Sequence, residues 1–224
     1  MAINSVERLG AISLIVGPIV SFIFFLVRPG VLLVDMADST DEAAQITALA
    51  SNSTLTHVAA LIAPVALVIT LYGLYVAQSR LRDGSRGDAL MGLGFMSFAV
   101  GTIGWITGLS LQHVLANTEL GAPGAVEAME PVYAVQAGVT LLSTLLVALG
   151  FLCFTLGAAQ RSEFSRVRAL VVAAASIVSA ASLTVGIILP ETAAVSVAIA
   201  RGIYIFWVVW LVLHGARILK SSNP

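Results

Sequence analysis

The chain has few charged residues: Asp, Glu, Lys and Arg make up only 10% of its 224 residues, whereas 58% are hydrophobic. The mean hydropathy is +1.00. A water-soluble domain of this length does not need so much apolar surface, and it normally carries about twice this share of charge. The composition therefore excludes a soluble globular protein. The formal net charge is −1, so the chain also lacks the basic surface that nucleic-acid binding requires.

Cysteine and catalytic signatures are scarce as well. Cys153 is the one cysteine, so no disulfide can form within the chain. No serine stands in a G-x-S-x-G elbow, no H-E-x-x-H zinc pattern occurs, and no glycine-rich phosphate loop with its lysine is present. We assign no catalytic residue. The sequence does not decide whether the chain is an enzyme, but these absences favour a protein that is not one.

What the chain does contain is six long apolar runs separated by short polar segments. A hydrocarbon layer of about 30 Å requires about 20 helical residues, and each run reaches that length. Strands of membrane barrels are about ten residues long and alternate apolar with polar residues, which these runs do not. We predict an all-α integral membrane protein, a single domain over residues 1–224. Its six transmembrane helices are predicted at residues 9–27, 56–77, 89–115, 132–159, 169–189 and 195–216.

The positions of the basic residues predict the orientation of the chain. Nine of the eleven Lys and Arg residues lie before the first run, after the sixth, or in the second and fourth connections, which leaves Arg28 and Arg201 for the opposite side. Short connections rich in arginine stay in the cytoplasm. We therefore expect a multi-pass protein of the cell (plasma) membrane with both termini cytoplasmic. The first run is longer than a signal-peptide core and ends at Arg28-Pro29-Gly30, so we expect it to be retained.

The connections differ on the two sides, and the runs resemble each other in pairs. Each run leaving the cytoplasm begins just after arginine, and each returning run ends with a small residue before arginine. Either the chain contains three helical hairpin repeats, or the positive-inside rule alone produces this likeness. The first external connection contains Ser39 followed by Glu42, a capping-box pattern that predicts a short helix through Ala50. The longer external connections form either a lid or plain solvated links.

Small residues on the third run predict close packing. Along this run they recur at steps of three and four, which places them on one face of a helix. In lipid, helices associate through such close contact rather than through the hydrophobic effect. We expect another helix to lie against this face, which consists of Gly94, Ser97, Gly101, Gly104 and Gly108. The fifth run shows the same spacing at Ala175, Ser179, Ser182 and Gly186.

Polar residues gather toward the external ends of the runs, and we predict that they converge on one external-facing ligand cavity. These candidate ligand-binding residues are His57, Gln112, His113, Glu130, Tyr133, Gln136, Arg201 and Tyr204. Arg201 is the most informative, because an arginine at the centre of a membrane helix costs at least about 2.5 kcal/mol and one partway in still needs compensation. Either Glu191 or Glu130 is its counter-ion, or it recognises an anionic substrate or lipid headgroup.

His57 and His113 admit two interpretations. Antiparallel helices bring them to similar depth, where two imidazoles can bind a b-type haem iron or a divalent metal. A metal site would need Glu130 or Gln112 as further ligands. Alternatively, both histidines are simply tolerated where water reaches a helix end. Haem b is the only cofactor we consider, and the sequence does not require it.

Three functional hypotheses follow, beyond the lipid bilayer as the surrounding partner. The leading one is binding or transport of a small anionic or amphipathic molecule, with Arg201 contacting its negative group and Tyr204 and Gln136 donating hydrogen bonds. The second is a non-catalytic subunit or scaffold, whose glycine face packs against a partner membrane subunit or a second copy of the chain. The third is a haem redox subunit with His57 and His113 as ligands.

Overall fold

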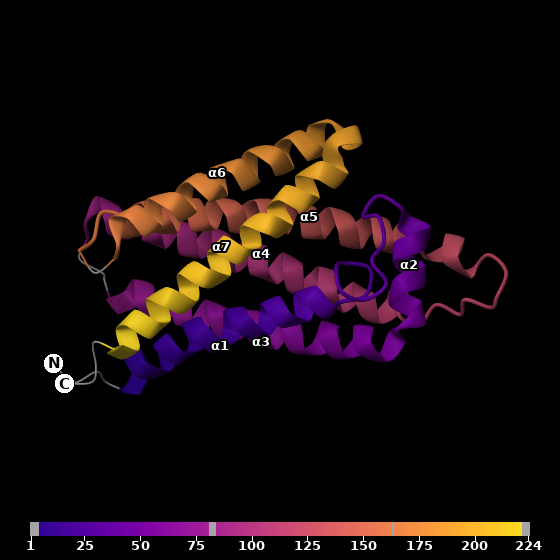
Figure 1. Cartoon of the computed structure of the whole chain (residues 1–224), viewed down its shortest axis with the longest axis horizontal. Helices are drawn as coiled ribbons and strands as arrows, with labels where there is room; N and C mark the ends of the chain where they lie inside the picture. Colours follow the sequence, from indigo (N-terminus) through magenta and orange to yellow (C-terminus); the bar gives the residue numbers. More distant parts are fainter. Residues whose placement is uncertain (1–4, 81–83, 163, 221–224) are drawn as a thin grey trace.

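The computed structural model describes residues 5–80, 84–162 and 164–220, and all regular secondary structure within these residues is helical (Figure 1). Six long helices are apolar enough to cross a membrane, joined by one short helix and one 3-10 turn. The elements in chain order are α1 (Ser5–Val27), α2 (Glu42–Ser51), α3 (Ser53–Arg80), α4 (Arg86–Leu115), α5 (Ala125–Ala158), α6 (Arg166–Ile188), η1 (Pro190–Thr192) and α7 (Ala193–Lys220).

The six predicted runs correspond to α1, α3, α4, α5, α6 and α7, and most helix ends lie a few residues beyond the predicted ones. The difference is largest for α5, which we expected to begin after Pro131 but which begins at Ala125. Proline in a helix removes one backbone hydrogen bond, but membrane helices tolerate it, and Pro131 lies within α5. With 34 residues, α5 is about 50 Å long at 1.5 Å per residue, so it extends well past the hydrocarbon layer.

The spanning helices form a closed ring. Each packs against its neighbours in the chain, and α7 returns to pack against α1. Figure 1 shows α7 crossing the bundle toward the beginning of α1, with both chain ends at the same end of the molecule. The pairs α1 with α3, α4 with α5, and α6 with α7 are adjacent antiparallel hairpins. This arrangement agrees with three hairpins, although a duplication of the hairpin remains a prediction.

The glycine face of the third run packs against α5, which confirms the predicted close contact. A Cβ atom added to Gly94 would collide with the backbone of Phe154 and Gly150. One at Gly101 would lie 2.7 Å from Val147 Cγ2 and 2.8 Å from the Ser143 carbonyl oxygen. Real Cβ atoms do not approach so closely, so only glycine allows this separation of the backbones.

Aromatic side chains fill the ring toward the end that carries the chain termini. Phe151 stacks on Trp207 with ring centroids 4.8 Å apart and meets Phe98 edge to face at 5.3 Å. Trp207 is 1% exposed, and its indole Nε1 donates a hydrogen bond of 3.0 Å to Ser176 Oγ on α6. These contacts join α4, α5, α6 and α7 into one core.

At the opposite end, α2 lies across the bundle and packs against α5, α4 and α3 (Figure 1). Ile46 and Leu49 form a buried cluster with Leu115 and Tyr133. The first connection is therefore a packed lid rather than a plain link. The predicted short helix exists, but the capping residue was wrong: Asp41, not Ser39, accepts a 2.9 Å hydrogen bond from the Ala44 N–H.

Gln45 ties the lid to the segment that follows α1. It is 1% exposed, and its Nε2 donates to the carbonyl oxygens of Gly30 at 2.9 Å, Ala37 at 3.0 Å and Asp38 at 3.3 Å. The two N–H protons of one buried amide are thus shared among three backbone acceptors. This arrangement fixes the position of the chain between Arg28 and α2.

Candidate ligand cavity

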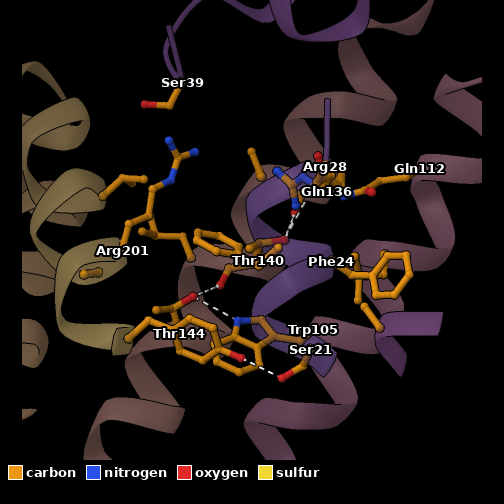
Figure 2. Close-up of a pocket in the computed structure, with 18 of the residues that line it drawn as sticks. Ser21, Phe24, Arg28, Ser39, Trp105, Gln112, Gln136, Thr140, Thr144 and Arg201 are labelled. Carbon is orange, nitrogen blue, oxygen red and sulfur yellow. Dashed lines mark hydrogen bonds between the residues drawn. The ribbon is translucent and has the colours of Figure 1, made fainter. Parts of the chain in front are cut away.

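The ring of helices encloses a cavity of about 200 Å³ at the end covered by α2 (Figure 2). All six spanning helices contribute to its lining, together with Ser39 from the connection between α1 and α2. Its walls are mainly small or apolar side chains, such as Ala59, Ala63 and Leu67 on α3 and Leu109 on α4. An apolar body of this kind accommodates a hydrophobic group.

Two arginines line the cavity toward the lid. Arg28 follows the last residue of α1, and Arg201 lies about two turns into α7. No carboxylate among the described residues lies within 4.0 Å of either guanidinium group, and the buried Nε of Arg28 has no hydrogen-bond partner among them. Burial, followed by the proximity of Arg201, lowers the pKa of Arg28 to about 10. The lid end of the cavity therefore carries two positive charges that have no carboxylate ion-pair partner among the described residues.

Polar uncharged side chains accompany the arginines. Gln112 on α4 is 0% exposed, and neither its Oε1 nor its Nε2 has a hydrogen-bond partner within the described part of the chain. Gln136 on α5 donates a 3.3 Å hydrogen bond to Thr140 Oγ1. Tyr133 also lines the cavity, on the first turns of α5. This end can therefore both donate and accept hydrogen bonds.

The opposite end of the cavity is a floor of aromatic rings whose polar atoms are already paired. Trp105 Nε1 donates to Thr144 Oγ1 at 3.0 Å, and the Tyr204 hydroxyl lies 2.9 Å from Ser21 Oγ (Figure 2). The rings of Trp105 and Tyr204 meet edge to face with centroids 5.9 Å apart. Beyond this floor lies a second void of only about 10 Å³, bounded in part by the same rings. The floor therefore closes the cavity toward the chain termini.

Five of the eight candidate residues predicted from the sequence line this one cavity, and three do not. Those in the lining are Gln112, Tyr133, Gln136, Arg201 and Tyr204. Glu130 is not part of the lining. His57 and His113 lie outside it and contact each other: their Nδ1 atoms are 2.8 Å apart, and their rings stack at an interplanar angle of 14°.

The histidine pair contains two imidazoles and no carboxylate ligand. His57 Nε2 also lies 3.3 Å from the Asn117 side-chain oxygen. No group of three or more His, Cys, Asp or Glu residues suited to a metal ion occurs in the described ranges. In this arrangement each histidine has the other as a hydrogen-bond partner. Haem ligation stays a prediction, and an absorbance spectrum of the purified protein decides it.

The proposed counter-ions of Arg201 were wrong. Neither Glu191 nor Glu130 forms an ion pair with it in the described structure, and Glu191 is exposed. Glu191 lies in η1 at the end of the helix connection, whereas Arg201 projects from α7 into the cavity. The sequence prediction that these residues lie on the same side of the membrane therefore did not imply contact between their side chains. Arg201 is therefore available to pair with an anionic group that enters the cavity.

Sequence reasoning missed Arg28 and the floor residues Ser21, Trp105 and Thr144. Arg28 carried a usable signal, since it and Arg201 are the two basic residues on the acidic side of the chain. Both arginines depart from the positive-inside pattern, and this shared exception indicates a common site. Trp105 and Thr144 gave no comparable signal, because a tryptophan and a threonine within apolar helices are equally compatible with packing.

Comparison with known proteins adds no family to this picture: no protein-family model, curated protein or solved structure matches the chain.

Proposed function

We propose that this polytopic membrane protein binds a small anionic, amphipathic molecule in the cavity beneath α2. The observation that carries the proposal is the pair Arg28 and Arg201, which line one cavity without a described carboxylate partner. Two such cations repel each other and favour an anion between them. Charge-assisted hydrogen bonds to guanidinium groups in a low-dielectric site are among the strongest that proteins form.

The shape of the lining supports an amphipathic ligand rather than an inorganic anion. The charged groups lie at the lid end, whereas the walls carry alanine and leucine and the floor carries Trp105 and Tyr204. A ligand with an acid at one end and an apolar tail places each part against matching groups. An inorganic anion would contact only the arginines and would not fill the apolar part of the cavity.

Binding can be tested with octanoate and its neutral counterpart octanol. The full chain is reconstituted in nanodiscs, and ligand affinity is measured by calorimetry for the wild type, Arg28→Gln and Arg201→Gln. Since each variant loses charge-assisted hydrogen bonds worth about 1.5–3 kcal/mol, we expect about 10- to 100-fold weaker octanoate binding. Arg168→Gln is the matched control, because Arg168 is exposed at the other end of the bundle. Equal binding of octanoate and octanol would refute the proposal.

Transport of the bound molecule is a further part of this proposal that the same cavity supports. Passage toward the chain termini requires the Trp105 and Tyr204 rings to move apart, because they separate the cavity from the small void beyond. Uptake of labelled octanoate into proteoliposomes tests this step. Saturable binding without any uptake would support a binding function and refute transport.

The scaffold hypothesis has lost the observation on which it was built. The glycine face of α4 is occupied by α5 of the same chain, as the contacts of Gly94 and Gly101 show. That face is therefore not free for a partner subunit or a second copy. Partner subunits remain a hypothesis without a specific surface.

We propose that the cavity faces the cell exterior and that both termini are cytoplasmic in the plasma membrane. An excess of arginine at the end of the bundle that carries the termini supports this orientation. In a Cys153→Ala background, a membrane-impermeant maleimide applied to intact cells should label Gly121→Cys and not Ser162→Cys. Labelling of the second variant instead would reverse the orientation.

A further inference from the structure

Gln112 differs from Gln45 and Gln136, the other buried glutamines at this end, whose amide nitrogens donate hydrogen bonds. Gln45, 1% exposed, satisfies its amide nitrogen with three backbone carbonyl oxygens. Gln112, 0% exposed, lines the cavity with both amide atoms unpartnered among the described residues. Leaving a buried polar group without a partner costs about 1–3 kcal/mol. We therefore expect a ligand bound in the cavity to supply the hydrogen-bond partners that the Gln112 amide lacks.

The two polar atoms of the Gln112 amide need different hydrogen-bond partners. Nε2 is a donor and is satisfied by an acid oxygen, whereas Oε1 is an acceptor and needs a donor. An ionised acid group offers acceptors alone, so it leaves Oε1 without a partner. Arg28 and Arg201 are both cationic donors that the acid group itself would engage. The ligand therefore needs a hydrogen-bond donor of its own close to the acid.

The rest of the cavity limits the ligand further. None of the described residues lining it is acidic, so an ammonium group finds no counter-ion and amino-acid zwitterions are disfavoured. The floor donors and hydroxyls are paired through Trp105 with Thr144 and Tyr204 with Ser21, which disfavours sugars. A volume of about 200 Å³ equals that of about seven liquid waters at ~30 Å³ each. Covalently bonded atoms lie closer together than separate water molecules do, so this volume suits an acid of roughly ten non-hydrogen atoms, such as octanoate.

We infer that the ligand is a medium-chain hydroxy acid, or an acid with an equivalent donor beside its carboxylate, and that Gln112 recognises this donor. The inference rests on the proposed function, since it places the carboxylate at Arg28 and Arg201. The hydroxyl donates to Gln112 Oε1 while Nε2 donates to an oxygen of the acid group. The alkyl tail lies against the apolar walls and reaches toward Trp105.

Three ligands of nearly equal size test this inference on the wild-type protein in nanodiscs: octanoate, 2-hydroxyoctanoate and 2-methoxyoctanoate. The hydroxy acid can donate, whereas the methoxy acid can only accept. We expect 2-hydroxyoctanoate to bind about tenfold more tightly than octanoate, in line with one hydrogen bond to an otherwise unpaired buried group. The methoxy acid should bind no better than octanoate.

Gln112→Met removes the amide with little change in volume. We expect the tenfold preference for 2-hydroxyoctanoate over octanoate to disappear. Octanoate itself should also bind more weakly than to the wild type, because the Nε2 donor to its acid group is lost as well. The melting temperature of the empty variant should rise, because a buried unpaired amide is gone. Gln160→Met, at an exposed glutamine near the chain termini, is the control and should keep the preference.

The outcomes separate the two proposals. Equal binding of all three acids overturns the hydroxy-acid inference and leaves anion binding intact. A preference that survives in Gln112→Met overturns the role of Gln112. Failure of all three acids to bind more tightly than octanol removes the proposed function and the inference with it. If Gln112→Met does not fold, the comparison of the hydroxy and methoxy acids on the wild type still decides.

Discussion

Both ends of α5 face the interior of the same ring of helices, but one end is packed against a core and the other lines a cavity. Near the chain termini, its inward positions Val147, Ala148 and Phe151 are 0–3% exposed and belong to the aromatic core. Near the lid, its inward positions include Gln136 and Thr140, which line the cavity. Within about three turns of one helix, the inward side chains thus pass from a packed core to the lining of a cavity.

This difference shows how a bundle in lipid can keep a cavity open. Lipid provides no hydrophobic force between helices, so association depends on close packing and hydrogen bonds. The packed end supplies both, through glycine contacts between α4 and α5 and through the Trp207 bond to Ser176. The cavity end, which α2 covers, leaves the Gln112 amide without a hydrogen-bond partner among the described residues. Stability is thereby concentrated away from the site.

We expect the largest effect on stability from a substitution that separates α4 from α5 at the packed end. In Gly94→Leu the new side chain would meet the backbone of Phe154 and Gly150, which cannot move without separating α4 from α5. We expect a loss of about 3 kcal/mol or more in the free energy of unfolding. Yield and thermal unfolding in mild detergent measure it.

Gly138→Leu is the control for this prediction. Gly138 lies on α5, and a Cβ atom added there would have no neighbouring described atom within 4 Å. Leucine favours a helix by several tenths of a kcal/mol or more over glycine, so this variant should be as stable as the wild type or more so. Equal destabilisation of both variants would show that packing between α4 and α5 does not hold this end together.

A second pair of variants compares the two ends of α5 directly. Ala148 is 0% exposed in the packed core, whereas Ala137 lines the cavity. Ala148→Phe should cost about 1–3 kcal/mol through overpacking. Ala137→Phe should fold with near-normal stability, because its ring enters existing space, and should lower octanoate affinity at least tenfold. A normal affinity in Ala137→Phe would mean that octanoate binds elsewhere.

The sequence predicted the fold better than the site, for physical reasons. Membrane spans follow from the length and continuity of apolar runs, and glycine spacing predicts a close contact such as that of Gly94. Neither depends on distant parts of the chain. The partner of that glycine face, α5, and the closure of the ring by α7 on α1 are long-range facts that no local pattern contains.

The site was predicted in part for a related reason. Depth along a helix follows from residue number, so Gln112 and Arg201 were placed at the correct end. The direction of each side chain around its helix does not follow from depth in apolar helices with little amphipathic pattern. His57 and His113 lie at the correct end but contact each other instead of lining the cavity. Glu130 failed as a counter-ion for the same reason.

The smallest effect, and the most specific one, is expected from Arg28→Lys. Burial and the nearby Arg201 lower the pKa of Arg28 to about 10, and the same causes should lower that of a lysine there below its ordinary ~10.4. A lysine keeps the charge at neutral pH, so octanoate affinity at pH 7 should fall only a few-fold, through loss of the bidentate guanidinium. As pH rises toward 10 the lysine loses its proton, and affinity should fall further than in the wild type.

The sign of the accompanying stability change distinguishes this titration from alkaline damage. The folded state of the empty protein disfavours the proton at position 28, so the unfolded state binds more protons between the folded and unfolded pKa values. Unfolding free energy should therefore rise with pH across that window while octanoate affinity falls. In Arg28→Lys the window begins at lower pH than in the wild type. Calorimetric titrations and thermal melts from pH 7 to 10 measure both quantities, and a parallel loss of stability and affinity would remove Arg28 from the anion site.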